Sequence, residues 1–273
     1  MHERNTALFT CVVFLALAAA GARAQTDAAA PAGETPEQKG LRIVRESERR
    51  DAGWLDMQSS VTMMLRNKSG QTSERKLRAS ALEVTDDGDK SLVVFDAPRD
   101  VSGTAFLSFS HALEPDEQWL FLPALKRVKR ISSANKSGPF MGSEFAYEDM
   151  ASPEVKKYTY KWLRDEAIDG RDSFVIEEYP QYEKSGYKRL ILWLDKERYV
   201  PLKTEFYDRK NSLLKTLTYH DYKQYLDKHW RPDETRMINH QTGKSTSLVS
   251  AAIRFKTGLE DGDFNQTALQ RAR

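Results

Sequence analysis

The sequence predicts a mainly β protein, built as a single curled antiparallel sheet that forms an open or half-closed barrel with a few helices on its concave side. Three observations lead to this fold class. From residue 54 to residue 256, apolar and polar residues alternate with a period of two, which is typical of strands with one buried face. Short turns rich in Gly, Asp, Asn and Ser separate these segments, so consecutive strands should pair as hairpins. A single sheet of about a dozen strands has to curl.

The predicted elements follow one another in a simple order. Thr35 can cap a first helix that has Pro36 at its first position and that should end at Gly53. A short helix that carries Leu269 should close the chain. The expected strands between these helices are, in chain order, 57–65, 76–81, 91–95, 104–110, 119–122, 126–131, 157–164, 173–179, 187–194, 199–207, 213–222, 230–240 and 247–256.

Residues 1–24 are predicted to be an export signal. A short polar region with one arginine precedes an apolar run, and the small residues that end at Ala24 provide a cleavage pattern. The one cysteine, Cys11, lies in the apolar run, so the exported chain would contain no disulfide. Residues 25–34 are predicted to be a flexible linker, and residues 35–273 to form one domain. We therefore expect a monomeric periplasmic protein.

Composition and motifs argue against several classes of function. The formal net charge is +2 with both signs interspersed, and an exported protein meets no chromosome, so nucleic-acid binding is not expected. The chain contains no Gly-x-Ser-x-Gly motif and no glycine-rich phosphate loop. The four histidines beyond the export signal lack partners at metal-ligand spacing; they are His111, His220, His229 and His240. We therefore predict no enzyme activity, no cofactor and no metal.

The stretch 116–150 has the most distinctive pattern, because it leads into a loop, 138–150, that mixes large apolar residues with acids. The apolar residues are Phe140, Met141, Phe145, Tyr147 and Met150, and the acids are Glu144, Glu148 and Asp149. Large apolar groups are costly to leave in water, so the loop should cover something. It either closes one end of the β core or acts as a gate over an apolar ligand, with its acids at the rim and paired with Arg127 or Arg130.

Four cations stand within five residues of the predicted strand 126–131: Lys126, Arg127, Lys129 and Arg130. One explanation is a solvated edge strand whose charges prevent sheet-to-sheet aggregation. The other explanation is a binding surface for an anionic lipid headgroup or for an acidic face of a membrane protein.

Aromatic strand residues are candidates for lining an apolar cavity, although most tryptophans simply pack the core. The candidate ligand-binding residues are Phe109, Trp119, Phe121 and Trp193 on strands, together with Phe140, Met141, Phe145 and Tyr147 on the loop. The alternation does not determine which face of each strand would line the cavity.

Several segments together resemble a known family. They are DEQWLFLPALKRVKRI (116–131), FMGSEFAYEDM (140–150), YVPLKTEFYD (199–208), Gly103-Thr104-Ala105 and Asp263-Phe264-Asn265. In this order, over nearly the whole predicted domain, they resemble the outer membrane lipoprotein-sorting protein family of LolA-like periplasmic proteins. The resemblance implies a curved sheet wrapped around helices, with an apolar cavity for the acyl chains of a lipid or lipoprotein. It also implies a carrier or chaperone that passes this ligand between envelope membranes, with an inner-membrane transporter of the resistance–nodulation–division class as partner.

Two other functions stay open at this point. The same sheet would suit a regulatory module that senses lipid or misfolded envelope protein, and a stable complex with a signalling protein would favour this function. A hydrolase acting on envelope material is disfavoured, because the sequence shows no evident catalytic nucleophile and no set of metal ligands. Measured turnover of an ester or a glycan would favour this hypothesis again.

Overall fold

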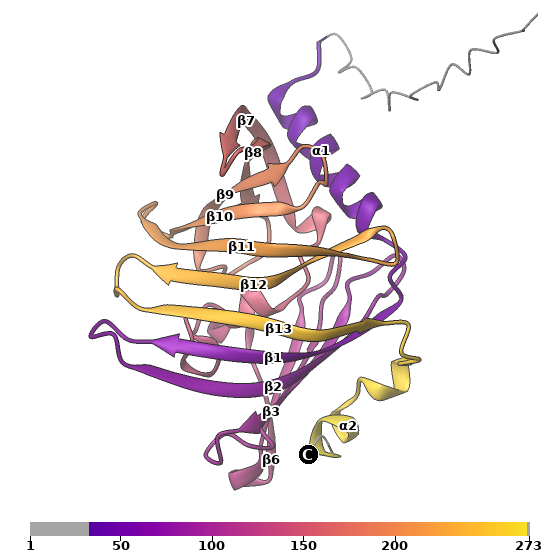
Figure 1. Cartoon of the computed structure of the whole chain (residues 1–273), viewed down its shortest axis with the longest axis vertical. Helices are drawn as coiled ribbons and strands as arrows, with labels where there is room; N and C mark the ends of the chain where they lie inside the picture. Colours follow the sequence, from indigo (N-terminus) through magenta and orange to yellow (C-terminus); the bar gives the residue numbers. More distant parts are fainter. Residues whose placement is uncertain (1–32, 272–273) are drawn as a thin grey trace, which may run out of the picture. The chain divides into compact units, whose positions relative to one another are not determined.

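The computed structural model describes residues 33–271, and the compact unit Glu34–Arg273 contains every helix and strand of that range. The predicted export signal and nearly all of the predicted linker lie outside the described residues. As predicted, the unit is mainly β: a single antiparallel sheet of 13 strands with two α-helices (Figure 1). In chain order the elements are α1 (Pro36–Asp51), β1 (Asp56–Arg66), β2 (Thr72–Leu82), β3 (Lys90–Ala97), β4 (Ala105–Phe109), β5 (Glu117–Leu122), β6 (Arg127–Arg130), β7 (Tyr158–Ile168), β8 (Arg171–Pro180), β9 (Tyr187–Asp195), β10 (Pro201–Asp208), β11 (Leu213–Tyr225), β12 (His229–Asn239), β13 (Ser245–Phe255) and α2 (Gln266–Arg271).

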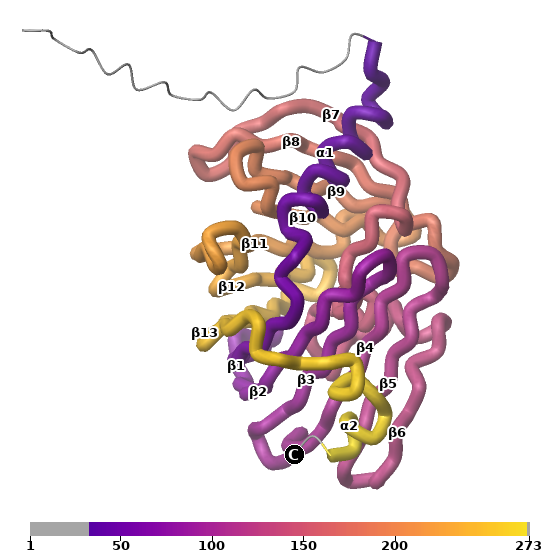
Figure 2. The backbone as a smooth tube through the Cα atoms, turned by 90° about the vertical axis from the view of Figure 1, so that its right-hand side faces the viewer, coloured from indigo at the N-terminus to yellow at the C-terminus, as the bar shows by residue number. Residues whose placement is uncertain are grey.

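The strand order shows how the chain is laid out, because it reads β6-β5-β4-β3-β2-β1-β13-β12-β11-β10-β9-β8-β7. The chain starts in the middle of the sheet at β1 and moves outward, hairpin by hairpin, to the edge strand β6. It resumes at the other edge, β7, and returns strand by strand to β13, which pairs with β1. β6 and β7 lie at opposite ends of the sheet (Figure 2). Residues 131–157, here called the connection, therefore have to cross one face of the sheet.

The sheet is neither closed nor strongly curled, so the prediction of a curled, half-closed barrel is wrong in this respect. Its two edge strands do not pair with each other. The physical reason is that the apolar face has another layer to pack against. The connection and α1 cover that face, and their side chains bury it without requiring the sheet to meet itself.

The strand register defines two faces. We call the face covered by the connection the crossed face, and Met63, Phe106 and Leu217 point into its apolar core. The other face, called the opposite face, carries Leu107 and Trp119 under the carboxy-terminal segment that includes α2. Helix α1 packs on the crossed face at β7 to β9, whereas α2 packs on the opposite face. The expectation that all helices lie on one side of the sheet is therefore wrong for α2.

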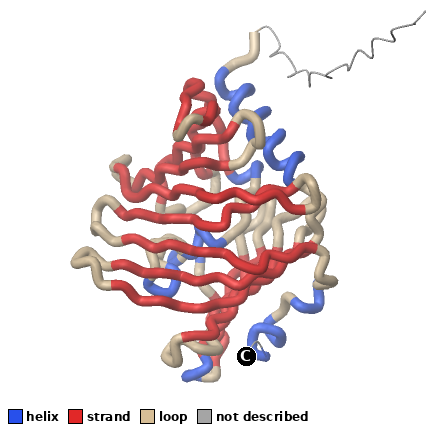
Figure 3. Tube along the Cα trace, viewed as in Figure 1, coloured by secondary structure: helices blue, strands red, loops and turns tan. Residues whose placement is uncertain are grey.

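Helix α1 begins where the sequence predicts it. Thr35 and Gln38 form a capping box, in which each side chain accepts a hydrogen bond from the backbone N–H of the other residue. Gly40 permits the close approach of α1 to β7, because a Cβ at this position would lie 2.8 Å from the backbone N of Trp162. In Figure 3, α1 is the long blue helix beside the red strands. No helix of the described range has the length and the apolar character that a membrane span requires.

Candidate functional site

The connection is the candidate site, and its central part is a tight turn that holds two aromatic residues in place. Phe140 and Phe145 face each other across the turn, and the N–H of Phe140 donates a hydrogen bond to the O of Phe145 at 2.7 Å. The N–H and the Oγ of Ser143 both donate to the O of Phe140. Met141 and Gly142 have positive φ angles of 51° and 77°, a conformation that suits Gly142 best. The turn is therefore stabilised by hydrogen bonds between its own residues.

The aromatic side chains of the connection belong to the core of the crossed face. Phe140 is 0% exposed, and its ring lies 5.1 Å from that of Phe106 and 6.0 Å from that of Phe95, between centroids. Tyr147 completes the group at 5.6 Å from Phe140. Phe145 is also buried in this core, while Met141 packs against its margin. The sequence interpretation that the loop covers apolar surface is confirmed, whereas its action as a gate stays a prediction.

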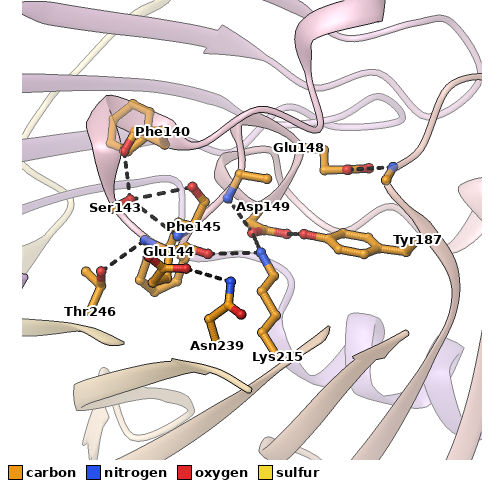
Figure 4. A network of polar contacts seen from close by, with 12 residues as sticks. Phe140, Ser143, Glu144, Phe145, Glu148, Asp149, Tyr187, Lys215, Asn239 and Thr246 are labelled. Carbon is orange, nitrogen blue, oxygen red and sulfur yellow. Dashed lines mark hydrogen bonds and ion pairs between the residues drawn. The ribbon is translucent and has the colours of Figure 1, made fainter. Parts of the chain in front are cut away.

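Asp149 forms a buried set of polar contacts between the connection and the sheet (Figure 4). Its Oδ2 accepts hydrogen bonds from Lys215 Nζ on β11 at 2.5 Å and from the N–H of Ala146 at 2.6 Å. Its Oδ1 accepts a third from the hydroxyl of Tyr187 on β9 at 2.7 Å. Lys215 is only 3% exposed and also donates to the carbonyl of Glu144 at 3.1 Å. This ion pair therefore lies in an environment where the loss of one partner is expensive.

The other two acids of the loop 138–150 are held by uncharged groups. Glu148 accepts from the N–H of Gly186 at 2.8 Å and from the hydroxyl of Ser185 at 2.9 Å, both in the β8–β9 turn. Burial raises the pKa of Glu148 above its ordinary value, while these hydrogen bonds oppose the rise. Glu144 accepts from the amide of Asn239 on β12 at 2.7 Å (Figure 4). Together, the three acids fasten the connection to β8–β12.

This arrangement corrects the predicted pairing of the acids with Arg127 or Arg130. Arg130 pairs instead with Glu117 on the adjacent strand β5, at 2.7 Å. The physical reason is topological: these cations lie on edge strand β6, whereas the acids sit over strands from the other half of the sheet. Lys126, Arg127, Lys129 and Arg130 do lie together on an exposed edge, as the sequence predicts.

A cavity of about 460 Å³ opens between the connection and the turns of the sheet beneath it. Its volume is in the range of small-molecule sites. Its wall is mixed, with the apolar groups Phe145, Tyr187 and Leu214 beside the polar groups Lys215, Arg209 and Asn239. A ligand there would contact both the aromatic turn and the Lys215 side of the polar network.

The structure does not bring the eight predicted ligand-binding residues together. Phe140, Met141, Phe145 and Tyr147 lie on the crossed face. Phe109, Trp119 and Phe121 belong instead to the apolar cluster of the opposite face, where a second cavity, of about 340 Å³, lies under the carboxy-terminal segment. Trp193 also points to the opposite face, from β9, where Lys203 Nζ lies 3.5 Å from its ring centroid.

Sequence reasoning missed Lys215, Tyr187 and Asn239. One signal was present for Lys215, because it stands at a strand position two residues before Leu217, in phase with the apolar residues of β11. A lysine in phase with buried residues predicts a buried partner. The sequence contains no comparable signal for Tyr187 or Asn239, whose roles depend on where the connection lies in space.

Comparisons with known proteins agree with this fold. No curated protein matches the chain. A family model that bears only the description of an uncharacterized protein matches residues 87–271. A domain from Vibrio parahaemolyticus, assigned to the outer membrane lipoprotein-sorting proteins, has a crystal structure with 57% sequence identity and a TM-score of 0.85. This match covers 86% of the present chain and 100% of the other.

Two further crystal structures are similar over most of their length. A DUF1329 family protein from Desulfovibrio piger is 27% identical, with a TM-score of 0.82 and coverage of 86% of this chain and 99% of that one. A LolA superfamily protein from Nitrosomonas europaea shares the fold at 22% identity, with a TM-score of 0.67 and coverage of 84% and 98%. The chain therefore belongs to the outer membrane lipoprotein-sorting protein family.

Proposed function

We propose that this protein is a periplasmic carrier that binds the acyl chains of a lipid or a lipid-modified protein against the crossed face, with the connection as the gate. The observation that carries the proposal is the position of the connection. It covers the apolar face with side chains from a segment that is not a strand of the sheet, next to a cavity of about 460 Å³. An acyl chain could take the place of these side chains.

The energetics of such an exchange are favourable. Each acyl CH₂ group removed from water contributes about 0.8 kcal/mol, so a long chain gains several kcal/mol by entering an apolar site. Moving Phe140 and Phe145 out of the core would cost a comparable amount unless the chain fills the space that they leave. Exchange of aromatic rings for an acyl chain keeps the crossed face buried throughout, which makes loading reversible.

The polar network would determine how readily the connection leaves the sheet. Glu148 and Glu144 are held by neutral hydrogen bonds, whose net contributions are about 1 kcal/mol each. The Asp149–Lys215 pair is the contact most sensitive to substitution, because loss of either partner leaves the other charge buried. Hand-over to an acceptor would follow differences in affinity, or be driven by an inner-membrane transporter of the resistance–nodulation–division class.

A reversible cross-link between the connection and the sheet tests the gate. The N–H of Glu144 donates to Thr246 Oγ1 on β13 at 3.0 Å, which brings these two positions within reach of a disulfide. The double variant Glu144→Cys, Thr246→Cys should take up a fluorescent fatty acid slowly when oxidised and, when reduced, at least as fast as the two single variants. Each single variant serves as a control for the loss of the native side chain.

The possible outcomes test the gating role of the connection and the carrier function of the protein separately. Equal uptake rates in the oxidised and reduced double variant would show that the connection does not gate the site. If the unmodified protein takes up no fatty acid, and if solvent extraction of protein isolated from its own periplasm yields no lipid, the carrier function itself is wrong.

A further inference from the structure

The turn between β5 and β6 presents an exposed leucine on a well-defined backbone. Pro123–Leu125 forms a single 3₁₀ turn, which Lys126 ends with a left-handed φ of 47° and an N–H that donates to the O of Pro123 at 3.1 Å. The turn is supported from below, because a Cβ on Gly103 would lie 3.5 Å from the ring of Pro123. Leu125 is nevertheless 68% exposed. The turn therefore presents the Leu125 side chain to solvent.

Four cations follow this leucine in the sequence. Lys126, Arg127 and Lys129 are exposed, and none of them pairs with a carboxylate among residues 33–271. Arg130 is the exception, since it pairs with Glu117. We call Leu125, Lys126, Arg127 and Lys129 the basic tip. β6 has a neighbour on one side only, so the basic tip stands at the free edge of the sheet.

Protection of the edge explains only part of this arrangement. Charged residues on an edge strand block pairing with other sheets, and that accounts for Arg127 and Lys129. It does not account for Leu125, which lies beyond the strand. The turn between β11 and β12 also has an exposed leucine, Leu226, which is 46% exposed. There, however, the neighbouring Lys228 donates a hydrogen bond to the carbonyl of Ala52.

We propose that the basic tip docks onto the surface of an anionic lipid bilayer, with Leu125 inserted among the headgroups and the three cations on lipid phosphates. An apolar side chain next to unpaired cations is the combination that binds the membrane interface. A specific protein partner would require about 800 Å² of shaped surface. One turn and a four-residue strand offer much less, whereas a lipid surface needs no matching shape.

The proposal goes beyond the proposed carrier function and does not depend on it. The basic tip lies at the β5–β6 turn and on β6, and none of its four residues belongs to the connection or to the wall of the 460 Å³ cavity. A bilayer contact at this site would bring the protein to the membrane whatever ligand the crossed face holds. Docking is therefore measurable without any acyl ligand.

Vesicle sedimentation tests the proposal, with the chain from Gln25 onward and vesicles of phosphatidylglycerol and phosphatidylcholine in a ratio of about 3:7. Lys126→Asn with Arg127→Gln removes two cations, and Asn tolerates the left-handed φ of position 126. Each cation near an anionic surface changes binding about fivefold, so this variant should bind about 25-fold more weakly at low salt. Leu125→Ser should weaken binding independently of salt.

Matched controls carry the same changes at other turns. Lys68→Gln with Lys244→Gln removes two exposed cations from the β1–β2 and β12–β13 turns, and Leu226→Ser removes an exposed leucine. Both controls should bind vesicles within about twofold of the unmodified protein if the tip is the docking surface. Thermal unfolding of every variant checks the fold, and uptake of fatty acid in the absence of vesicles should remain unchanged.

Three results would overturn the proposal. One is that the unmodified chain does not sediment with the anionic vesicles. Another is that the control pair loses as much binding as the tip pair, because the attraction would then be a property of the overall charge. The third is that the tip variants bind vesicles normally but lose a cross-link to an acidic membrane protein, which would make the tip a protein-binding surface.

Discussion

Replacement of Lys215 by Met should detach the connection from the sheet, because it leaves the Asp149 carboxylate buried without a counter-charge. Removing one partner of a buried ion pair costs about 3–5 kcal/mol. Asp149 keeps two donors, the N–H of Ala146 and the hydroxyl of Tyr187, so we expect a loss at the lower end, about 3 kcal/mol. Urea unfolding, followed by tryptophan fluorescence, measures this loss as a fall in the midpoint.

The same pair permits a double-mutant cycle. Asp149→Asn alone leaves the ammonium of Lys215 buried, and should be about as costly as Lys215→Met. The double variant buries no charge, so it should be more stable than the sum of the two single losses predicts, by about 2 kcal/mol or more. Limited proteolysis should cut the connection faster in either single variant than in the double variant.

Lys223→Met is the matched control, since Lys223 lies on the same strand and pairs with Asp233 at an exposed position. Its unfolding midpoint should not change, because exposed ion pairs contribute little. The reasoning is refuted if Lys215→Met is as mild as this control, or if the losses of the two single variants simply add in the double variant.

Three further predictions are independent of the ion pair. Phe140→Ala should lower the free energy of unfolding by about 3–5 kcal/mol, because the ring is fully buried; a loss below about 1 kcal/mol in equilibrium unfolding would exclude the connection from the core. Burial raises the pKa of Glu178 from 4.5 to about 7, so between these pH values the folded state keeps a proton that the unfolded state releases. The free energy of unfolding should therefore fall by up to about 3 kcal/mol as the pH rises from about 4.5 to about 7. Glu178→Gln should therefore stabilise the protein at pH 8 but hardly at pH 4, and thermal unfolding that shifts equally at both pH values would contradict this account. Amino-terminal sequencing of exported protein should begin at Gln25, and a mature chain that still carries Cys11 would disprove the predicted cleavage.

The strands and α1 could be predicted because their signals are local. Alternation along β1 and the Thr35 cap depend on residues that are close in sequence. The assignment of faces could not be predicted, because β4 is apolar on both sides: Phe106 faces the connection, while Ala105 and Leu107 face the α2 segment. Alternation fails as a guide wherever both faces of a strand are covered.

The candidate site was predicted in position but not in its contacts. The apolar residues of the loop indicated a cover, and the structure places Phe140 and Phe145 in the core. Proximity in the sequence favours pairing of the acids with Arg127 or Arg130, whereas Asp149 pairs with Lys215, which lies on a strand far along the chain. Such a partner follows from strand order, and the strand order itself depends on the long-range pairing of β1 with β13.

The central pairing of β1 with β13 also bears on the kinetics of folding. Every other pair in the sheet joins strands that are consecutive in the sequence, so two meanders, β1–β6 and β7–β13, can each form from local hairpins. The seam between them pairs residues such as Val61 with Ser250, across almost the whole domain. Closing so large a loop has an entropic cost before any contact forms, and non-local pairing slows folding. We therefore expect the seam to form last, which leaves the inner edges of both meanders unpaired during the slowest stage of folding.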